Sequence, residues 1–155
     1  MGNLLIGSQK ARLDKSGRIK IPEKFRAAIE EQYGKELYIT SLQDEFIQIF
    51  PLPVWVEMSN PPQRTMTYPD PDFQEFWRQA HAKGMSGEID AKGRVLISPK
   101  LREKAGLEKE VEVVAMHNYL EVWDKNRLMA KIETKPLNYD DFKRISKLMS
   151  DRKAE

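Results

Sequence analysis

The side chains best suited to chemistry in this sequence are arginines and lysines gathered around two short turns. The two groups consist of Lys10, Arg12, Lys15, Arg18 and Lys20, and of Lys92 and Arg94. Ammonium and guanidinium groups bind phosphate oxygens, and an arginine beside a rigid turn can donate two hydrogen bonds to a guanine edge. These residue types therefore indicate binding to an anionic polymer. The alternative is that the same side chains form an ordinary solvated surface.

The distribution of charge favours the binding interpretation. The chain has 155 residues and a net charge of only +2. Residues 10–26 hold seven Lys or Arg against two acids, and residues 92–104 hold five against one. Residues 27–90 hold four against eleven. Because phosphate binding depends on clustered charge rather than on total charge, two basic segments in an otherwise acidic or neutral chain predict contact with nucleic acid.

An aspartate and a glycine precede the arginine of each group and should build the turn. These turn-forming residues are Asp14 and Gly17 in the first group, and Asp90 and Gly93 in the second. An aspartate side chain can accept hydrogen bonds from backbone N–H groups just ahead of it, and glycine takes a positive φ without strain. We expect each aspartate to rigidify its turn and orient the arginine that follows. Ordinary turn chemistry without a ligand would need the same residues.

Other kinds of site are poorly supported. The chain has no cysteine, and neither His81 nor His117 has a partner at metal-ligand spacing. The spacing of Trp55, Trp77 and Trp123 favours packing over base stacking. No nucleophile elbow, phosphate-binding glycine loop or zinc-protease motif is present. We expect no enzyme activity, cofactor, metal or small-molecule substrate.

The two basic groups belong to two copies of one sequence unit. Residues 14–26 and 90–102 align at a constant offset of 76, with six of thirteen positions identical. Each copy predicts a strand, the turn, a β-branched strand and a helix that begins at Pro22 or Pro99, the latter behind Ser98 as N-cap. Lys24, Arg26, Lys100 and Arg102 on these helices should form surface ion pairs. Two further strands are expected in each copy, at 36–42 and 46–50, and at 110–116 and 119–123.

Helices complete the expected organisation. Each copy should close with a helix, near 53–58 and near 126–132. Asp70 as N-cap predicts a helix over 71–82 with an apolar face, and another amphipathic helix is expected over 138–150. We expect four segments: a first repeat (5–60), a linker with a helix (61–83), a second repeat (84–133), and a C-terminal helix and tail (134–155).

The pattern Asp-x-x-Gly-Arg followed by Ile-x-Ile-Pro resembles the AbrB-like swapped-hairpin barrel, a small DNA-binding fold shared with several antitoxins. Two copies in a chain of this length resemble the MraZ family, regulators of the division and cell-wall gene cluster. Flanking stretches agree, namely Phe50-Pro51-Leu52-Pro53-Val54-Trp55 and Leu120-Glu121-Val122-Trp123-Asp124. The first copy departs from the family in having Ser16 where lysine usually precedes the glycine.

The resemblance implies an α+β fold in which two pseudo-symmetric strand–turn–strand–helix units form a swapped-hairpin β-barrel core with peripheral helices. It also implies a sequence-specific, double-stranded-DNA-binding transcription regulator that assembles as a ring-shaped homo-oligomer on direct repeats in a promoter. No run of eighteen apolar residues and no signal peptide is seen, so we expect a cytoplasmic protein without a membrane partner. The DNA binding that the resemblance implies would make it nucleoid-associated. One alternative is an antitoxin-like module whose main partner is a toxin protein. Another is a purely structural oligomer.

Overall fold

The computed structural model describes residues 5–60 and 70–154, and these residues form an α+β fold, as expected. The chain divides into two compact units, residues 1–125 and residues 126–155. Part of the expected linker, residues 61–69, lies outside the described residues. The two repeats of the sequence lie almost entirely within the first unit.

Both copies follow the predicted order of elements. The first copy contains β1 (Ser8–Arg12), β2 (Arg18–Lys20), α1 (Glu23–Tyr33), β3 (Glu36–Thr40), β4 (Ile47–Pro51) and α2 (Leu52–Ser59). The second contains β5 (Met85–Glu88), β6 (Arg94–Leu96), α4 (Pro99–Ala105), β7 (Glu110–Ala115), β8 (Leu120–Asp124) and α5 (Lys125–Thr134). α3 (Pro71–Lys83) lies between the copies, and α6 (Tyr139–Ala154) follows them. Every expected element is therefore present, with shifted ends.

Helix ends follow from identifiable residues. The side chain of Asp70 accepts a hydrogen bond from the Asp72 N–H and caps α3, and Ser98 accepts one from the Leu101 N–H and caps α4. α4 stops where Gly106 takes a left-handed conformation with φ +63°. These caps satisfy backbone groups that a helix end leaves without intrahelical partners. Both N-caps agree with the prediction.

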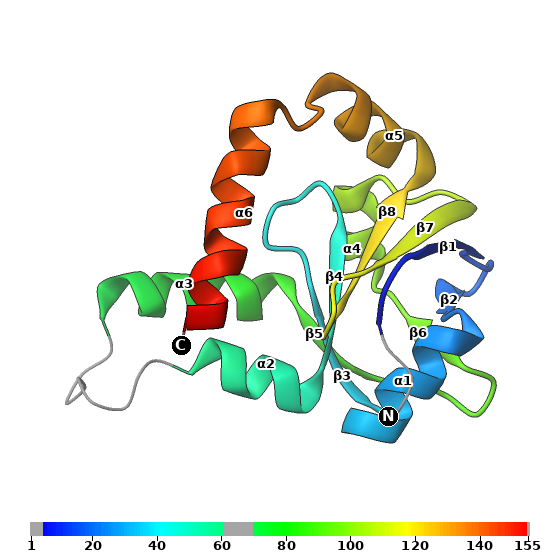
Figure 1. Cartoon of the computed structure of the whole chain (residues 1–155). Helices are drawn as coiled ribbons and strands as arrows, with labels where there is room; N and C mark the ends of the chain where they lie inside the picture. Colours follow the sequence, from blue (N-terminus) through cyan, green and yellow to red (C-terminus); the bar gives the residue numbers. More distant parts are fainter. Residues whose placement is uncertain (1–4, 61–69, 155) are drawn as a thin grey trace. The chain divides into compact units, whose positions relative to one another are not determined.

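The main sheet exchanges strands between the two copies. Its six antiparallel strands run in the order β1-β7-β8-β4-β3-β5, so that β1 pairs with a strand of the second copy and β5 with a strand of the first. Figure 1 shows β1 beside β7, although the two strands are far apart in the sequence. Interchanging the copies reverses this order and leaves every pairing unchanged. The six-stranded sheet therefore has an internal pseudo-twofold relation, and it is open, with β1 and β5 at its two ends.

A second sheet has two strands, β2 and β6, one from each copy, and has the same pseudo-twofold symmetry. We call it the β2–β6 ribbon. Ile19 pairs with Val95 at its centre, and the flanking pairs are Arg18 with Leu96 and Lys20 with Arg94. At its two ends the Ile97 N–H donates to the Gly17 carbonyl and the Ile21 N–H to the Gly93 carbonyl, each at 2.9 Å. The two predicted turns thus lie at opposite ends of one ribbon.

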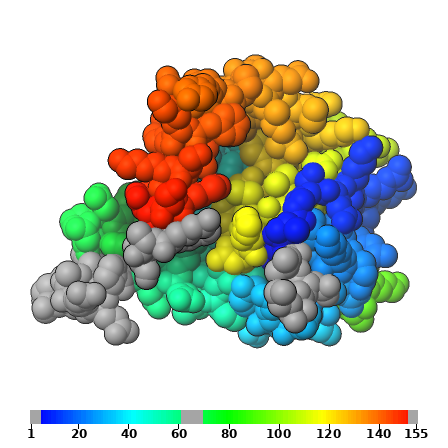
Figure 2. Space-filling model, viewed as in Figure 1, coloured from blue at the N-terminus to red at the C-terminus, as the bar shows by residue number. Residues whose placement is uncertain are grey.

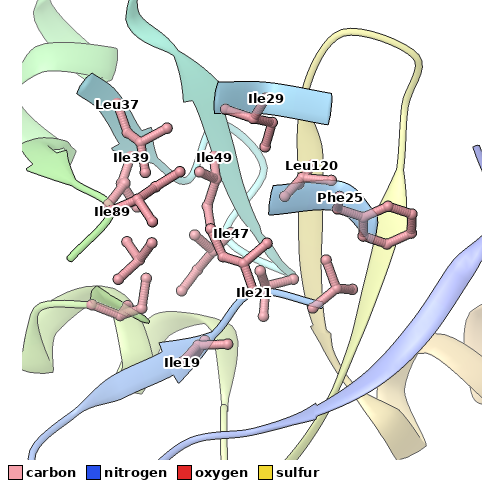
Figure 3. Close-up of a cluster of buried hydrophobic side chains, with 14 of the residues drawn as sticks. Ile19, Ile21, Phe25, Ile29, Leu37, Ile39, Ile47, Ile49, Ile89 and Leu120 are labelled. Carbon is pink, nitrogen blue, oxygen red and sulfur yellow. The ribbon is translucent and has the colours of Figure 1, made fainter. Parts of the chain in front are cut away.

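One hydrophobic core joins the two copies. Figure 3 shows side chains from β2, α1, β3 and β4 of the first copy converging with Ile89 and Leu120 of the second. Ile19 and Val95 at the centre of the ribbon are 1% and 0% exposed, so the inner face of the ribbon closes onto this core. Burial on this scale is the main force that holds such a fold together. The two copies therefore pack on each other around this shared core.

A second, aromatic cluster lies between the sheet and helices α2 and α3, which Figure 1 shows side by side. Trp55 stacks on Tyr38 in this cluster, with ring centroids 4.8 Å apart. Outside the cluster, Trp123 stacks on Phe46 at 4.5 Å. The Trp77 Nε1–H donates to the Ser59 carbonyl at 2.7 Å. All three tryptophans therefore serve packing, as the sequence predicted.

The second unit consists of most of α5 and all of α6. Asn138 and Asp141 exchange side-chain-to-backbone hydrogen bonds at 3.0 and 2.9 Å and start α6 as a reciprocal cap. Several large apolar side chains of α6 are exposed, namely Tyr139, Phe142, Leu148 and Met149. Across the part of the chain that the structure describes, no helix combines the length and apolar character needed to span a bilayer.

Candidate nucleic-acid interface

The first turn is held by a single carboxylate oxygen. Asp14 Oδ1 accepts hydrogen bonds from the Ser16 N–H at 2.9 Å, the Ser16 hydroxyl at 2.6 Å and the Arg18 N–H at 2.9 Å. The Gly17 N–H donates to the Asp14 carbonyl at 3.1 Å, and Gly17 has a φ of +86°. The Arg18 guanidinium donates through Nη1 to the Ser16 hydroxyl at 3.0 Å. Arg18 is therefore oriented by a neutral partner, and its positive charge is not neutralised there.

The second turn has the same backbone but a different arginine environment. Asp90 Oδ1 accepts from the Lys92 and Arg94 N–H groups, both at 2.8 Å. Arg94 Nε donates to Asp90 Oδ2 at 3.1 Å, and Arg94 Nη1 lies 3.8 Å from Asp14 Oδ2 of the other copy. Arg94 thus lies between two carboxylates, in contrast to Arg18. An arginine paired with carboxylates has less net charge available for an added anion.

Hydrogen bonds to both aspartates favour their ionised form. The Ser16 hydroxyl, followed by the Arg18 N–H, lowers the pKa of Asp14 from its ordinary value of 3.8. The Arg94 N–H is the largest cause that lowers the pKa of Asp90, with smaller contributions from the Lys92 N–H and the Arg94 side chain. Both turns are therefore built around carboxylates that stay charged at neutral pH. The predicted rigidifying role of the aspartates agrees with this geometry.

The β2–β6 ribbon brings three of the expected basic residues to one outer face. Side chains alternate across a strand, and the buried Ile19 and Val95 define the inner face, so Arg18, Lys20 and Arg94 share the outer face. Lys20 is exposed, and the two arginines are partly exposed. A two-stranded ribbon with a basic outer face has the dimensions of an element that enters the major groove of B-DNA.

The other expected residues lie outside this face. Lys10 and Arg12 are exposed on β1, directly across from Glu112 and Glu110 of β7. In Figure 2 the blue segment that includes β1 lies at the molecular surface. Lys15 and Lys92 are exposed in the two turns. The glutamates reduce the positive potential around the β1 pair, whereas the turn lysines extend the charge of the ribbon.

Two arginines that were expected only to form surface ion pairs prove to support the turns. Arg26 forms the expected ion pairs with Glu23 and Glu30, but its Nη2 also lies 3.4 Å from the carbonyl of Ala91, in the turn of the other copy. Because a Cβ atom at Gly93 would lie 3.0 Å from Cδ of Arg26, this side chain covers the glycine.

Arg102 occupies the equivalent position under the first turn. A Cβ atom at Gly17 would lie 3.0 Å from its Cζ, and its Nε is buried without a hydrogen-bond partner among the described residues. Among the described residues Arg102 forms no ion pair, in contrast to the prediction, because the exchange of strands carries the turn of one copy over the helix of the other. Arg26 and Arg102 are identical across the repeat, which could have singled them out, but no local pattern relates either arginine to a turn. Lys24 and Lys100 are exposed, but neither forms an ion pair with another described residue, so the expected ion pairs are not found.

The histidines show no site. His81 packs against the rings of Tyr38 and Trp55 at 5.5 and 5.8 Å, and His117 has a positive φ of +69°. Within residues 5–60 and 70–154, no group of three or more histidine and carboxylate side chains is placed to hold a metal ion.

Comparisons with known proteins agree with the repeat. The family model described as "MraZ protein, putative antitoxin-like" matches residues 4–65 and again residues 80–142. The chain is 34% identical over 137 residues to "Transcriptional regulator MraZ" of Acidobacterium capsulatum, covering 87% of this chain and 92% of the relative. It is 35% identical to the same-named protein of Acidovorax sp. strain JS42 (81% and 85% covered) and 32% identical to that of Finegoldia magna (83% and 87% covered). The chain therefore belongs to the MraZ family.

Proposed function

We propose that the protein is a sequence-specific transcription regulator that binds double-stranded DNA through the outer face of the β2–β6 ribbon. The observation that carries the proposal is the convergence of Arg18, Lys20 and Arg94 on this face, with a carboxylate-braced turn at each end. The relatives are named transcriptional regulators, which supports the same conclusion. The promoter of the division and cell-wall gene cluster is the proposed target, and the nucleoid the proposed location.

The two copies should contribute unequally to binding. Arg18 donates to a neutral hydroxyl, so its guanidinium can form a bidentate contact with a phosphate or a guanine without losing an ion pair. Arg94 would have to leave Asp90 and Asp14 to do the same. We propose that Arg18 reads a base, that Lys15, Lys20 and Lys92 bind phosphates, and that Arg94 mainly braces the ribbon. Lys10 and Arg12 would add phosphate contacts at the edge of the interface.

The strand exchange supports the swapped-hairpin arrangement and the proposed repeat boundaries. Beyond the paired strands, Leu13 forms a bridge with Ile19, and its N–H donates to the Lys109 carbonyl at 2.9 Å. The ribbon is thereby linked to both copies next to the main sheet. The two matches of the family model support division into a first repeat of 5–60 and a second of 84–133, joined by the segment 61–83 and followed by 134–155.

We further propose that several chains assemble into a ring that presents one ribbon per subunit to direct repeats in a promoter. Linked binding sites raise affinity for repeated DNA elements without any new type of contact. The exposed apolar side chains of α6 provide a candidate subunit contact, whereas Phe76 and Trp77 of α3 already pack within the chain. Exposed apolar surface of this kind is typical of interfaces.

An antitoxin-like function remains the second candidate, because the family model carries that description and α6 offers an apolar surface to a protein partner. In that case a partner protein, rather than other copies of the chain, would cover α6. The purified protein would then be monomeric, and its mass would increase only on addition of that partner.

The proposed function is tested with the duplex directly upstream of the protein's own gene. Fluorescence anisotropy against this duplex and a scrambled duplex of equal length should show preference for the first. If binding involves about six to ten phosphate contacts, raising the salt from 50 to 200 mM should weaken it by roughly a thousandfold or more. Equal binding to both duplexes, or affinity independent of salt, would contradict the proposal.

A further inference from the structure

One apolar side chain stands on the basic outer face of the β2–β6 ribbon. Leu96 is 42% exposed and pairs directly across from Arg18. Ile19 and Val95 form the buried inner face of the ribbon, so Leu96 does not contribute to the core. The two outer cross-strand pairs of the ribbon are thus Arg18 with Leu96 and Lys20 with Arg94.

The position of Leu96 breaks the symmetry between the copies. At an offset of 76, Arg18 corresponds to Arg94, which is identical, but Lys20 corresponds to Leu96. The outer face therefore has an arginine at both equivalent positions 18 and 94. At the other pair of equivalent positions it has a lysine at 20 and a leucine at 96. A fully symmetric face would read the same in both directions along DNA, whereas this face has a distinct apolar end.

We propose that Leu96 contacts the C5-methyl group of a thymine next to the base that Arg18 reads. This inference rests on the proposed function. The thymine methyl is the apolar feature that the major groove offers to a side chain, and apolar contact with it distinguishes thymine from cytosine. Opposed side chains in an antiparallel pair are about 4.5–5.5 Å apart, which corresponds to one or two base steps of roughly 3.4 Å.

The proposal gives the binding site a direction. Arg18 and Leu96 lie in the same cross-strand pair, so the guanine contact and the thymine contact fall side by side at one end of the ribbon. At the other end Lys20 lies opposite Arg94, which is held by Asp90 and Asp14. Each subunit would therefore recognise a non-palindromic element that is read in one direction.

The test uses duplexes that the full-length wild-type protein selects from a random-sequence library. In the preferred duplex, each thymine is replaced in turn by deoxyuridine, which removes only the C5-methyl group. One replacement should weaken wild-type binding by about fourfold, the equivalent of ~0.8 kcal/mol for one buried methyl-sized group. The variant Leu96→Ser should bind more weakly and lose the penalty at that thymine alone, while Leu96→Met should retain it.

The matched control is Val56→Ser, which removes another exposed apolar side chain, 50% exposed on α2, and should leave every deoxyuridine penalty unchanged. The inference is overturned if no thymine shows a penalty, if Leu96→Ser keeps the wild-type pattern, or if that variant only changes the oligomer mass. If the wild type has selected a preferred duplex, any of these results overturns only the Leu96 contact and is compatible with the proposed function. Failure of the wild type to select any sequence would overturn both.

Discussion

Arg18 and Arg94 occupy equivalent positions of the repeat and yet have different neighbours. A serine hydroxyl orients Arg18, whereas Asp90 and Asp14 flank Arg94. The difference traces to a single position, because Ser16 of the first copy corresponds to Lys92 of the second. Ser16 is thus the residue that donates to Asp14 and accepts from Arg18.

The lowered pKa values of Asp14 and Asp90 predict a loss of stability in acid. A carboxyl whose pKa is lower in the folded state stabilises the fold fully above its ordinary pKa of 3.8, and that contribution disappears as pH falls through the folded value. When the pH is lowered from 6 to about 2, the melting temperature should therefore begin to fall once the pH is below the ordinary pKa of these carboxyl groups. The Asp14→Asn variant should melt at a lower temperature than the wild type at pH 6. Its melting temperature should then fall by less than that of the wild type when the pH is lowered. A wild-type-like slope in that variant would contradict the prediction.

Gly17 should matter for binding as well as for stability. Its φ of +86° disfavours any side chain, so Gly17→Ala should destabilise the protein by about 1–2 kcal/mol. The added Cβ would also press on the Arg102 guanidinium beneath the first turn, and DNA affinity should fall. Gly34→Ala is the matched control, because its φ of +91° is similar and nothing lies within 4 Å of the added Cβ. Gly34→Ala should also lose stability in urea unfolding, because the φ of +91° and ψ of −165° at this position disfavour a side chain, but it should keep DNA affinity. Equal affinity in both variants would refute a special role for the first turn.

At the scale of elements, local signals in the sequence predicted most of the fold. Asp70 and Ser98 marked helix starts, and the Asp–Gly spacing marked both turns. The sequence did not reveal that β1 pairs with β7 or that β5 pairs with β3, because strand partners distant in sequence leave no local pattern. For the same reason, the support that Arg26 and Arg102 give to the opposite turns was missed. Closure of the strands into a barrel came from resemblance alone, and the six-stranded sheet is open.

The exchange of strands predicts that one copy cannot fold alone as a monomer. A fragment of residues 1–60 would lack β7, the partner of β1, and β6, the partner of β2. It should be unfolded by circular dichroism, or should form a homodimer in which two fragments reproduce the pseudo-twofold arrangement. Sedimentation gives its mass, and a folded monomeric fragment would show that the exchanged pairings are dispensable.

For the whole molecule, assembly should depend on the apolar side chains of α6. Phe142 and Leu148 are exposed in the single chain, and burial in a subunit contact would remove them from water. Light scattering at micromolar concentration should give a mass of more than two chains for the wild type, and a lower mass for Phe142→Lys combined with Leu148→Lys. Lys147→Glu on the same helix serves as a charge-changing control and should keep the wild-type mass. A monomeric wild type would contradict ring assembly.

The affinity of Arg18→Ala for the duplex upstream of the gene tests the central claim most directly. The contact that is lost should be worth about 1–3 kcal/mol per engaged subunit, and over several subunits binding should disappear at 150 mM salt. Arg94→Ala should lose less, because Arg94 is already paired with carboxylates. Arg78→Ala, which removes an exposed arginine of α3, should bind as wild type does. Melting temperature and mass should stay near wild-type values in Arg18→Ala. A folded, fully assembled Arg18→Ala protein that binds this duplex with wild-type affinity would show that the outer face of the β2–β6 ribbon is not the DNA-binding surface.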